Sequence, residues 1–107
     1  MGCEQLLSNM RSILKCEDLK RIECKEVIDG LACVVLDLHG LSYKNAVKMI
    51  KNVISVNRGA FVINAIHGYS HGTILKEMIN NELLSYRISK RYTPAWNPGQ
   101  TYLKIAA

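Results

Sequence analysis

Hydrophobic and polar residues follow a helical period in some segments of this chain and form short apolar runs in others. Residues 4–15 place leucine, isoleucine and methionine at helical spacing, which predicts an amphipathic helix. Apolar runs rich in β-branched residues over 33–38 and 60–66 predict buried strands. Helical spacing returns after each run, from Ser42 to Asn57 and over 73–84. Strands and helices are therefore expected to alternate.

Two more strands are expected near the end of the chain, over 87–92 and 101–105. The loop between them holds both prolines. Helices that alternate with strands predict an α/β sandwich with a parallel pair of strands at its centre. A chain of 107 residues has room for one such core.

The segment over 17–31 fits either a helix or a strand. Leu19, Ile22 and Glu26 have helical spacing, whereas Ile22, Cys24 and the apolar residues after them suit an extended chain. We interpret residues 1–32 as a helical N-terminal extension and residues 33–107 as the functional domain.

Neither a membrane span nor a secretory signal is expected, because the longest apolar run falls well short of about 20 residues. We therefore expect a cytoplasmic protein. The four cysteines form no Cys-x-x-Cys pair, and their spacings fit no zinc template. In a reducing compartment they are expected to remain free thiols.

Positive charge is concentrated in the second part of the chain. Residues 1–36 hold five basic and six acidic side chains, whereas residues 37–107 hold nine basic and three acidic ones. Such a basic domain suggests a polyanionic partner, with RNA or DNA as the leading candidate. Solubility alone is the alternative explanation for the charge.

A histidine followed by a glycine ends each predicted central strand, as His39-Gly40 and His67-Gly68. Ligands of open α/β sheets bind beyond the carboxyl ends of the strands, so parallel strands would bring both histidines to one rim. Asp37 lies two residues before His39, on the same face of an extended strand, where it can orient the imidazole. A structural histidine is the plainer reading of each position taken singly.

This combination is typical of acid–base catalysis on a phosphodiester. An imidazole can take a proton from a nucleophile or give one to a leaving oxygen. Lys76, one turn into the second core helix, could stabilise charge on the phosphate. The stripe of Lys44, Lys48 and Lys51 on the first core helix could bind the backbone of a nucleic acid, or it could be only the solvated face of that helix.

No cofactor is expected. A divalent metal is an alternative, since Asp37, His39, His67 and His71 are all potential ligands, but their spacing matches no standard template.

Two motifs resemble those of the Smr domain, the small MutS-related domain. The first is Leu36-Asp37-Leu38-His39-Gly40, which matches the hallmark LDLHG in full. The second is the loop from His67 to Gly72, followed by Leu75-Lys76 where the family has a Leu-Arg pair. The resemblance runs from about Val34 to Ile105 and includes the turn before the final strand.

The resemblance implies a two-layer α/β sandwich with a central four-stranded mixed sheet, like the C-terminal domain of translation initiation factor three. It implies a nuclease that nicks DNA or cleaves RNA, in some members on messenger RNA at stalled ribosomes. Asp37 and His39 carry over as the essential pair, His67 and Gly68 as the second loop, and Lys76 in place of the usual arginine.

The second loop departs from the family pattern in several places. Ser70 stands where a glycine is common, and Tyr69 replaces a residue that is often basic but can stack on a base. His71 is an additional candidate acid or base. Lys76 offers a point charge in place of a bidentate guanidinium.

The sequence therefore predicts an Smr-type endonuclease with Asp37, His39 and His67 as catalytic residues. A binding module without turnover and an enzyme acting on a small phosphorylated metabolite are the alternatives. The residues expected to bind nucleic acid or phosphate are Gly40, Lys44, Gly68, Tyr69, Ser70, His71, Gly72, Lys76, Lys90 and Arg91.

Aromatic residues flank the basic pair Lys90-Arg91. Tyr92 and Trp96 alternate with this pair as aromatics do in proteins that bind single-stranded nucleic acid. The alternative for Trp96 is that it packs over its own loop as a lid.

Overall fold

The two strands that end at the histidine-glycine pairs lie side by side. β2 (Leu31–Asp37) and β3 (Phe61–Ile66) are parallel, and their register pairs Asp37 with Ile66. The chain passes from one to the other through α3 (Tyr43–Val56), the kind of crossover that parallel neighbours need. Ser42 caps this helix by accepting a hydrogen bond from the Asn45 amide at 3.2 Å. The predicted parallel pair is confirmed.

The computed structural model describes residues 2–12, 14–68, 74–81 and 84–107, with residues 25 and 26 described by their backbone alone. The remaining elements are α1 (Cys3–Arg11), α2 (Cys16–Leu19), β1 (Ile22–Ile28), α4 (Ile74–Asn81), β4 (Ile88–Tyr92) and β5 (Gln100–Ile105). None of the helices in these ranges is both long and apolar enough to cross a membrane.

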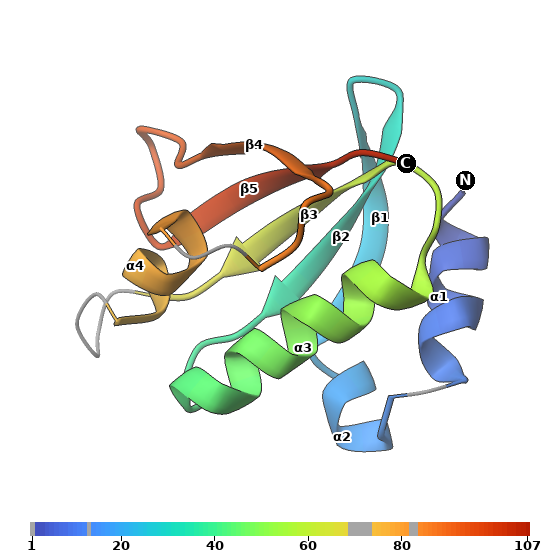
Figure 1. Cartoon of the computed structure of the whole chain (residues 1–107), viewed down its shortest axis with the longest axis horizontal. Helices are drawn as coiled ribbons and strands as arrows, with labels where there is room; N and C mark the ends of the chain where they lie inside the picture. The colour runs from blue at the N-terminus through green and yellow to red at the C-terminus, as the bar shows by residue number, and fades with distance from the viewer. Residues whose placement is uncertain (1, 13, 69–73, 82–83) are drawn as a thin grey trace.

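The fold is a compact α/β fold whose strands form one mixed sheet in the order β1-β2-β3-β5-β4 (Figure 1). β2 and β3 are its parallel pair, and the other neighbours are antiparallel. The sheet thus has five strands in the described ranges, one more than the four we predicted.

The additional strand is β1, and it shows that the prediction of a helical extension over 1–32 is wrong for residues 22–28. Ile22 and Cys24 both turn into the core, with the exposed Glu23 between them. This two-residue period suits a strand. Asp29 and Gly30 have positive φ angles and form the tight turn that joins β1 to β2.

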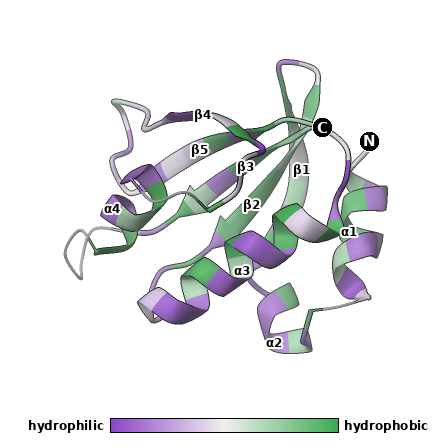
Figure 2. Cartoon of the chain, in the orientation of Figure 1, coloured by the Kyte–Doolittle hydropathy of each residue, from purple (hydrophilic) through white to green (hydrophobic). Residues whose placement is uncertain are grey.

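The helices α1, α3 and α4 cover one face of the sheet (Figure 1). Alternate strand residues such as Leu36, Ile63 and Leu103 are fully buried against them. Figure 2 shows α3 striped with hydrophobic and hydrophilic residues, as a helix with one buried side requires. The residues between these strand positions belong to the opposite face of the sheet.

A disulfide between Cys3 and Cys24 joins α1 to β1, with 5.4 Å between the two Cα atoms. We predicted free thiols, because the spacing of the cysteines carries no pairing signal. The pair arises from the fold, which places α1 against β1. Cys16 and Cys33 do not take part in a disulfide.

Candidate functional site

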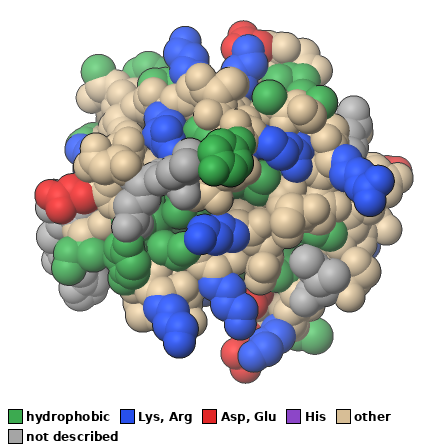
Figure 3. Space-filling view, in the orientation of Figure 1, with side chains coloured by type: hydrophobic (Ala, Val, Ile, Leu, Met, Phe, Trp, Pro, Cys, Tyr) green, Lys and Arg blue, Asp and Glu red, His purple; other side chains and the backbone are tan. Residues whose placement is uncertain are grey.

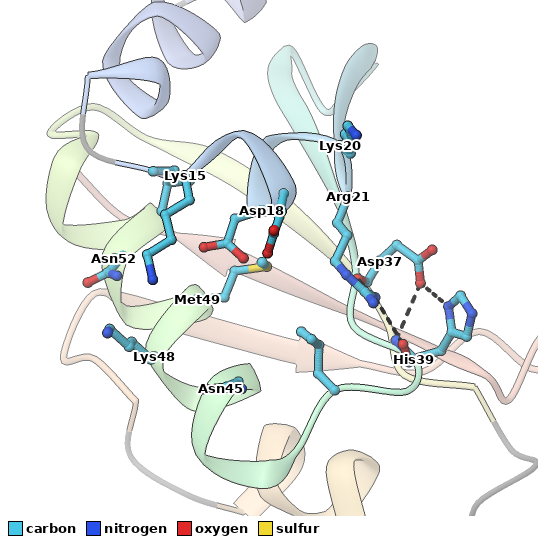
Figure 4. A pocket seen from close by; sticks show the side chains of 13 residues that line it. Lys15, Asp18, Lys20, Arg21, Asp37, His39, Asn45, Lys48, Met49 and Asn52 are labelled. Atoms are coloured by element: carbon cyan, nitrogen blue, oxygen red, sulfur yellow. Dashed lines mark hydrogen bonds and ion pairs between the residues drawn. The ribbon is translucent and has the colours of Figure 1, made fainter.

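Asp37 and His39 form a close pair at the carboxyl end of β2 (Figure 4). His39 Nδ1 contacts Asp37 Oδ1, and the His39 amide donates to the same oxygen at 3.3 Å. The histidine side chain is 64% exposed and the aspartate side chain 38% exposed. Because a carboxylate accepts hydrogen bonds, we assign the proton of the neutral ring to Nδ1, which leaves Nε2 as the basic nitrogen. Because the His39 side chain is exposed, a polymeric substrate could reach this nitrogen.

Arg21 binds the backbone of both Asp37 and His39. Its Nη1 donates to the carbonyl oxygens of Asp37, at 3.1 Å, and of His39, at 2.9 Å. The Asp37 amide in turn donates to the Arg21 carbonyl at 2.8 Å. Sequence reasoning missed Arg21 because no motif links it to the His39 loop. It reaches the site only because β1 pairs with β2.

The imidazole of His67 does not join the pair. His67 follows Ile66, which is in register with Asp37, so its side chain points to the opposite face of the sheet. It is buried, with 7% of its surface exposed, whereas the side chain of His39 is mostly exposed. The structure therefore brings the backbone of His67 and Gly68 to the rim, but not the imidazole of His67, which was predicted to be catalytic.

Both nitrogens of His67 have partners in the core. Nδ1 donates to the Gly68 carbonyl at 3.0 Å, which leaves Nε2 to accept from the Thr101 hydroxyl, also at 3.0 Å. Thr101 Oγ1 lies 3.0 Å from Thr93 Oγ1 and 3.4 Å from Asn80 Nδ2. Burial lowers the pKa of His67, and the charge of Lys76 lowers it further, against an upward effect of the hydrogen bond to Gly68. His67 is a neutral, structural group here.

Gly68 lies against His39. A Cβ atom at Gly68 would lie 3.5 Å from His39 Cβ. Its φ of 73° is in the region that favours glycine, as is the φ of 78° at Gly40. The Gly99 carbonyl accepts hydrogen bonds from the amides of His67, at 3.0 Å, and Gly68, at 2.9 Å. Gly40 and Gly68 thus shape the rim through their backbones.

The predicted cations are spread over several surfaces. Lys44 is exposed in the first turn of α3, and Lys76 on α4 lines a smaller pocket on another part of the surface. Lys90 and Arg91 fall on opposite faces of β4: Arg91 Nε donates to the Ile79 carbonyl on the helical face at 3.0 Å. The predictions for Tyr69, Ser70, His71 and Gly72 lie outside the described residues.

A cleft of about 630 Å³ opens beside His39, between α2, α3 and the end of β2 (Figure 4). Lys15, Lys20, Arg21 and Lys48 line it together with acidic Glu17 and Asp18. The space-filling view shows lysine and arginine side chains distributed over this face of the molecule, including the region of α3 and α2 (Figure 3). The cleft has both signs of charge, with the cations in excess even when Asp37 is included.

Trp96 is 81% exposed, so it does not pack over its loop as a lid. In the described ranges, no group of three or more histidine, cysteine, aspartate and glutamate side chains is arranged to hold a metal ion.

Comparisons with known proteins gave no match among family models, curated proteins or solved structures.

Proposed function

We propose that the protein is an endonuclease that binds and cleaves RNA or DNA, with Asp37 and His39 as its acid–base pair. One observation carries the proposal: an exposed histidine is held by a carboxylate at the end of a central strand, beside a cleft rich in cations. Open α/β sheets bind their ligands at this position. The resemblance of the segment 36–40 to the Smr hallmark supports the same conclusion.

The pair can activate a nucleophile. Nε2 of His39 takes a proton from a hydroxyl group, whose oxygen attacks the phosphorus while the bond to the leaving oxygen breaks. Asp37 holds the ring through Nδ1 and stabilises the imidazolium that forms. The leaving oxygen takes a proton from water or from a second acid. Arg21 and Lys48 line the cleft and supply positive charge for a phosphate.

RNA is the substrate that this arrangement favours. Its 2′-hydroxyl is already held next to the phosphorus, so one base suffices to start the reaction. DNA lacks this group, and a water molecule would have to be both positioned and activated. The described residues place one histidine at the rim, which fits the simpler reaction.

The same proposal includes the detailed fold of the core and the place in the cell where the protein acts. We infer a core like the C-terminal domain of translation initiation factor three, built from β2, β3, β4 and β5, with β1 added at one edge. Action in the cytoplasm on RNA, including RNA at ribosomes, is what the resemblance suggests.

A nucleic-acid-binding module without turnover is the second candidate. The side chain of His67 favours it, because this residue is buried and bound to Thr101 instead of standing at the rim. Among the described residues the rim then holds one of the two expected acid–base side chains, which fits binding without turnover.

The test is a cleavage assay with labelled single-stranded RNA and with supercoiled DNA, in EDTA and then in magnesium or manganese. His39→Ala is compared with the wild type, and thermal unfolding checks that both are folded. We expect RNA cleavage in EDTA that falls at least about 100-fold in the variant. Equal rates would exclude His39 as the centre, and binding without cleavage in any condition would establish the binding module.

A further inference from the structure

The face of the sheet away from the helices carries a continuous row of side chains across four strands. The register aligns Val35 with Asn64, Asn64 with Tyr102 and Tyr102 with Tyr92. Thr101 and Leu103, on either side of Tyr102, are fully buried on the helical side. The row therefore lies on the opposite face.

Two tyrosines of this row form an aromatic surface. The rings of Tyr92 and Tyr102 are nearly parallel, at 13°, with their centroids 5.1 Å apart. Tyr92 is 39% exposed although it belongs to a strand. A cross-strand aromatic pair also stabilises a sheet, but that role alone does not need the exposed surface that Tyr92 keeps.

Cations accompany the two rings. Lys90 Nζ lies 5.5 Å from the centroid of Tyr92. Lys104 is paired with Lys90 in the register and is exposed on the same face. The exposed Trp96 follows in the loop after β4. Flat aromatic surfaces bordered by lysines are suited to bases and phosphates together.

A polar pair stands in the centre of the same face. Asn64 is 94% buried, and its Nδ2 donates to Gln100 Oε1 at 3.2 Å. Its Oδ1 is buried with no hydrogen-bond partner in the part of the chain that the structure describes. Asn64 therefore lies inside the fold at the centre of the row, whereas Tyr92 is exposed.

The row lies next to the Asp37 end of the sheet. Asp37 is two residues beyond Val35 on β2 and is in register with Ile66 and Gln100. Tyr102 is two strands away, which corresponds to about 10 Å across the sheet and about 7 Å along it. A few nucleotides of single strand could span this distance.

We propose that the β4–β5 part of this face is the binding track for single-stranded RNA, with bases stacked on Tyr92 and Tyr102 and phosphates held by Lys90 and Lys104. The track deepens the proposed function, on which it rests, because it leads the strand to His39. It selects single strands, since a base can stack on a side chain only when its own face is free.

Binding and cleavage are measured separately, so that each proposal can fail alone. Fluorescence anisotropy measures the Kd of the full chain for a labelled single-stranded RNA and for the same sequence as a duplex. Every protein carries His39→Ala, so that turnover does not consume the probe. The variants are Tyr92→Leu, which removes the ring, and Tyr92→Phe, which keeps it. Tyr86→Leu removes another exposed tyrosine before β4 and is the matched control.

We expect Tyr92→Leu to raise the Kd for single-stranded RNA about tenfold. Tyr92→Phe and Tyr86→Leu should bind like the parent, and the Kd for the duplex should not depend on residue 92. The proposed binding track would be wrong if Tyr92→Leu left the Kd for single-stranded RNA unchanged. It would also be wrong if the variant lost as much affinity for the duplex as for the single strand. Neither result would bear on cleavage, which the His39→Ala assay decides.

Discussion

Asp37 pairs with Ile66, and not with His67, in the parallel register of β2 and β3. This relationship sends the two histidines of the rim to opposite faces of the sheet. His39 stays with Asp37 in the open, while His67 turns into the core and binds Thr101. One histidine is therefore available for chemistry, and the other supports the loop at Gly68.

Asp37→Asn should lower the rate of RNA cleavage by about 100-fold or more. An amide can present its NH₂ to Nδ1, which favours the wrong tautomer, and it cannot stabilise an imidazolium as a carboxylate does. The rate is measured under single-turnover conditions, with the RNA Kd determined in parallel. Asp29→Asn is the matched control, because Asp29 lies in the β1–β2 turn and asparagine accepts its φ of 53°. Equal rates for the two variants would remove Asp37 from the mechanism.

Acid should destabilise the fold partly through His67. Its pKa is lowered in the folded state, so between the two pKa values the unfolded chain binds more protons. The contribution of His67 to stability is complete above the unfolded pKa of about 6.5 and is lost as the pH falls toward the folded pKa. Urea unfolding at several pH values between 7.5 and 5 measures the effect.

His67→Gln supplies the comparison for this pH dependence. Glutamine does not titrate, so the variant should lose part of the slope of the unfolding free energy against pH. It should be less stable than the wild type at pH 7.5 by about 1–3 kcal/mol, since hydrogen bonds to Gly68 and Thr101 are weakened. A slope identical to that of the wild type would show that His67 does not titrate in this range.

The sequence was sufficient to predict the parallel pair, because apolar runs and helical periods fix those elements locally. It was not sufficient for β1. There the helical spacing of Leu19, Ile22 and Glu26 competed with alternation of Ile22 and Cys24. The signal that could have decided is Asp29-Gly30, a dipeptide typical of two-residue hairpin turns.

The site could be predicted only as far as the chain order determines it. Asp37 and His39 are neighbours on one strand, so their contact follows from a two-residue period. The face of the sheet to which His67 points depends on the register of β3 with β2. The position of Arg21 depends on the pairing of β1 with β2. Neither feature can be deduced from the local spacing of residues. A shift of the β2–β3 register by one residue would turn His67 to the other face of the sheet.

Gly68→Ala should reduce cleavage more than Gly30→Ala does. Both glycines have positive φ, 73° and 78°, so either substitution costs about 1–2 kcal/mol of stability. A new Cβ at Gly68 lies next to His39, whereas Gly30 has no atom within 4 Å of such a carbon. Thermal unfolding and kcat/KM are measured for both. Similar losses of activity in the two variants would mean that Gly68 matters for stability alone.

Reduction should destabilise the chain by releasing α1 from β1. The disulfide of Cys3 with Cys24 closes a loop with a sequence separation of 21 residues, for which chain entropy gives about 3 kcal/mol of stabilisation. Urea unfolding with and without dithiothreitol measures the difference in the wild type. Cys3→Ser should match the reduced wild type and should not respond to the reductant. Cys16→Ser, which removes a free thiol, should keep the full response. A wild type that is equally stable in both conditions would show that this pair of thiols does not hold α1 in place.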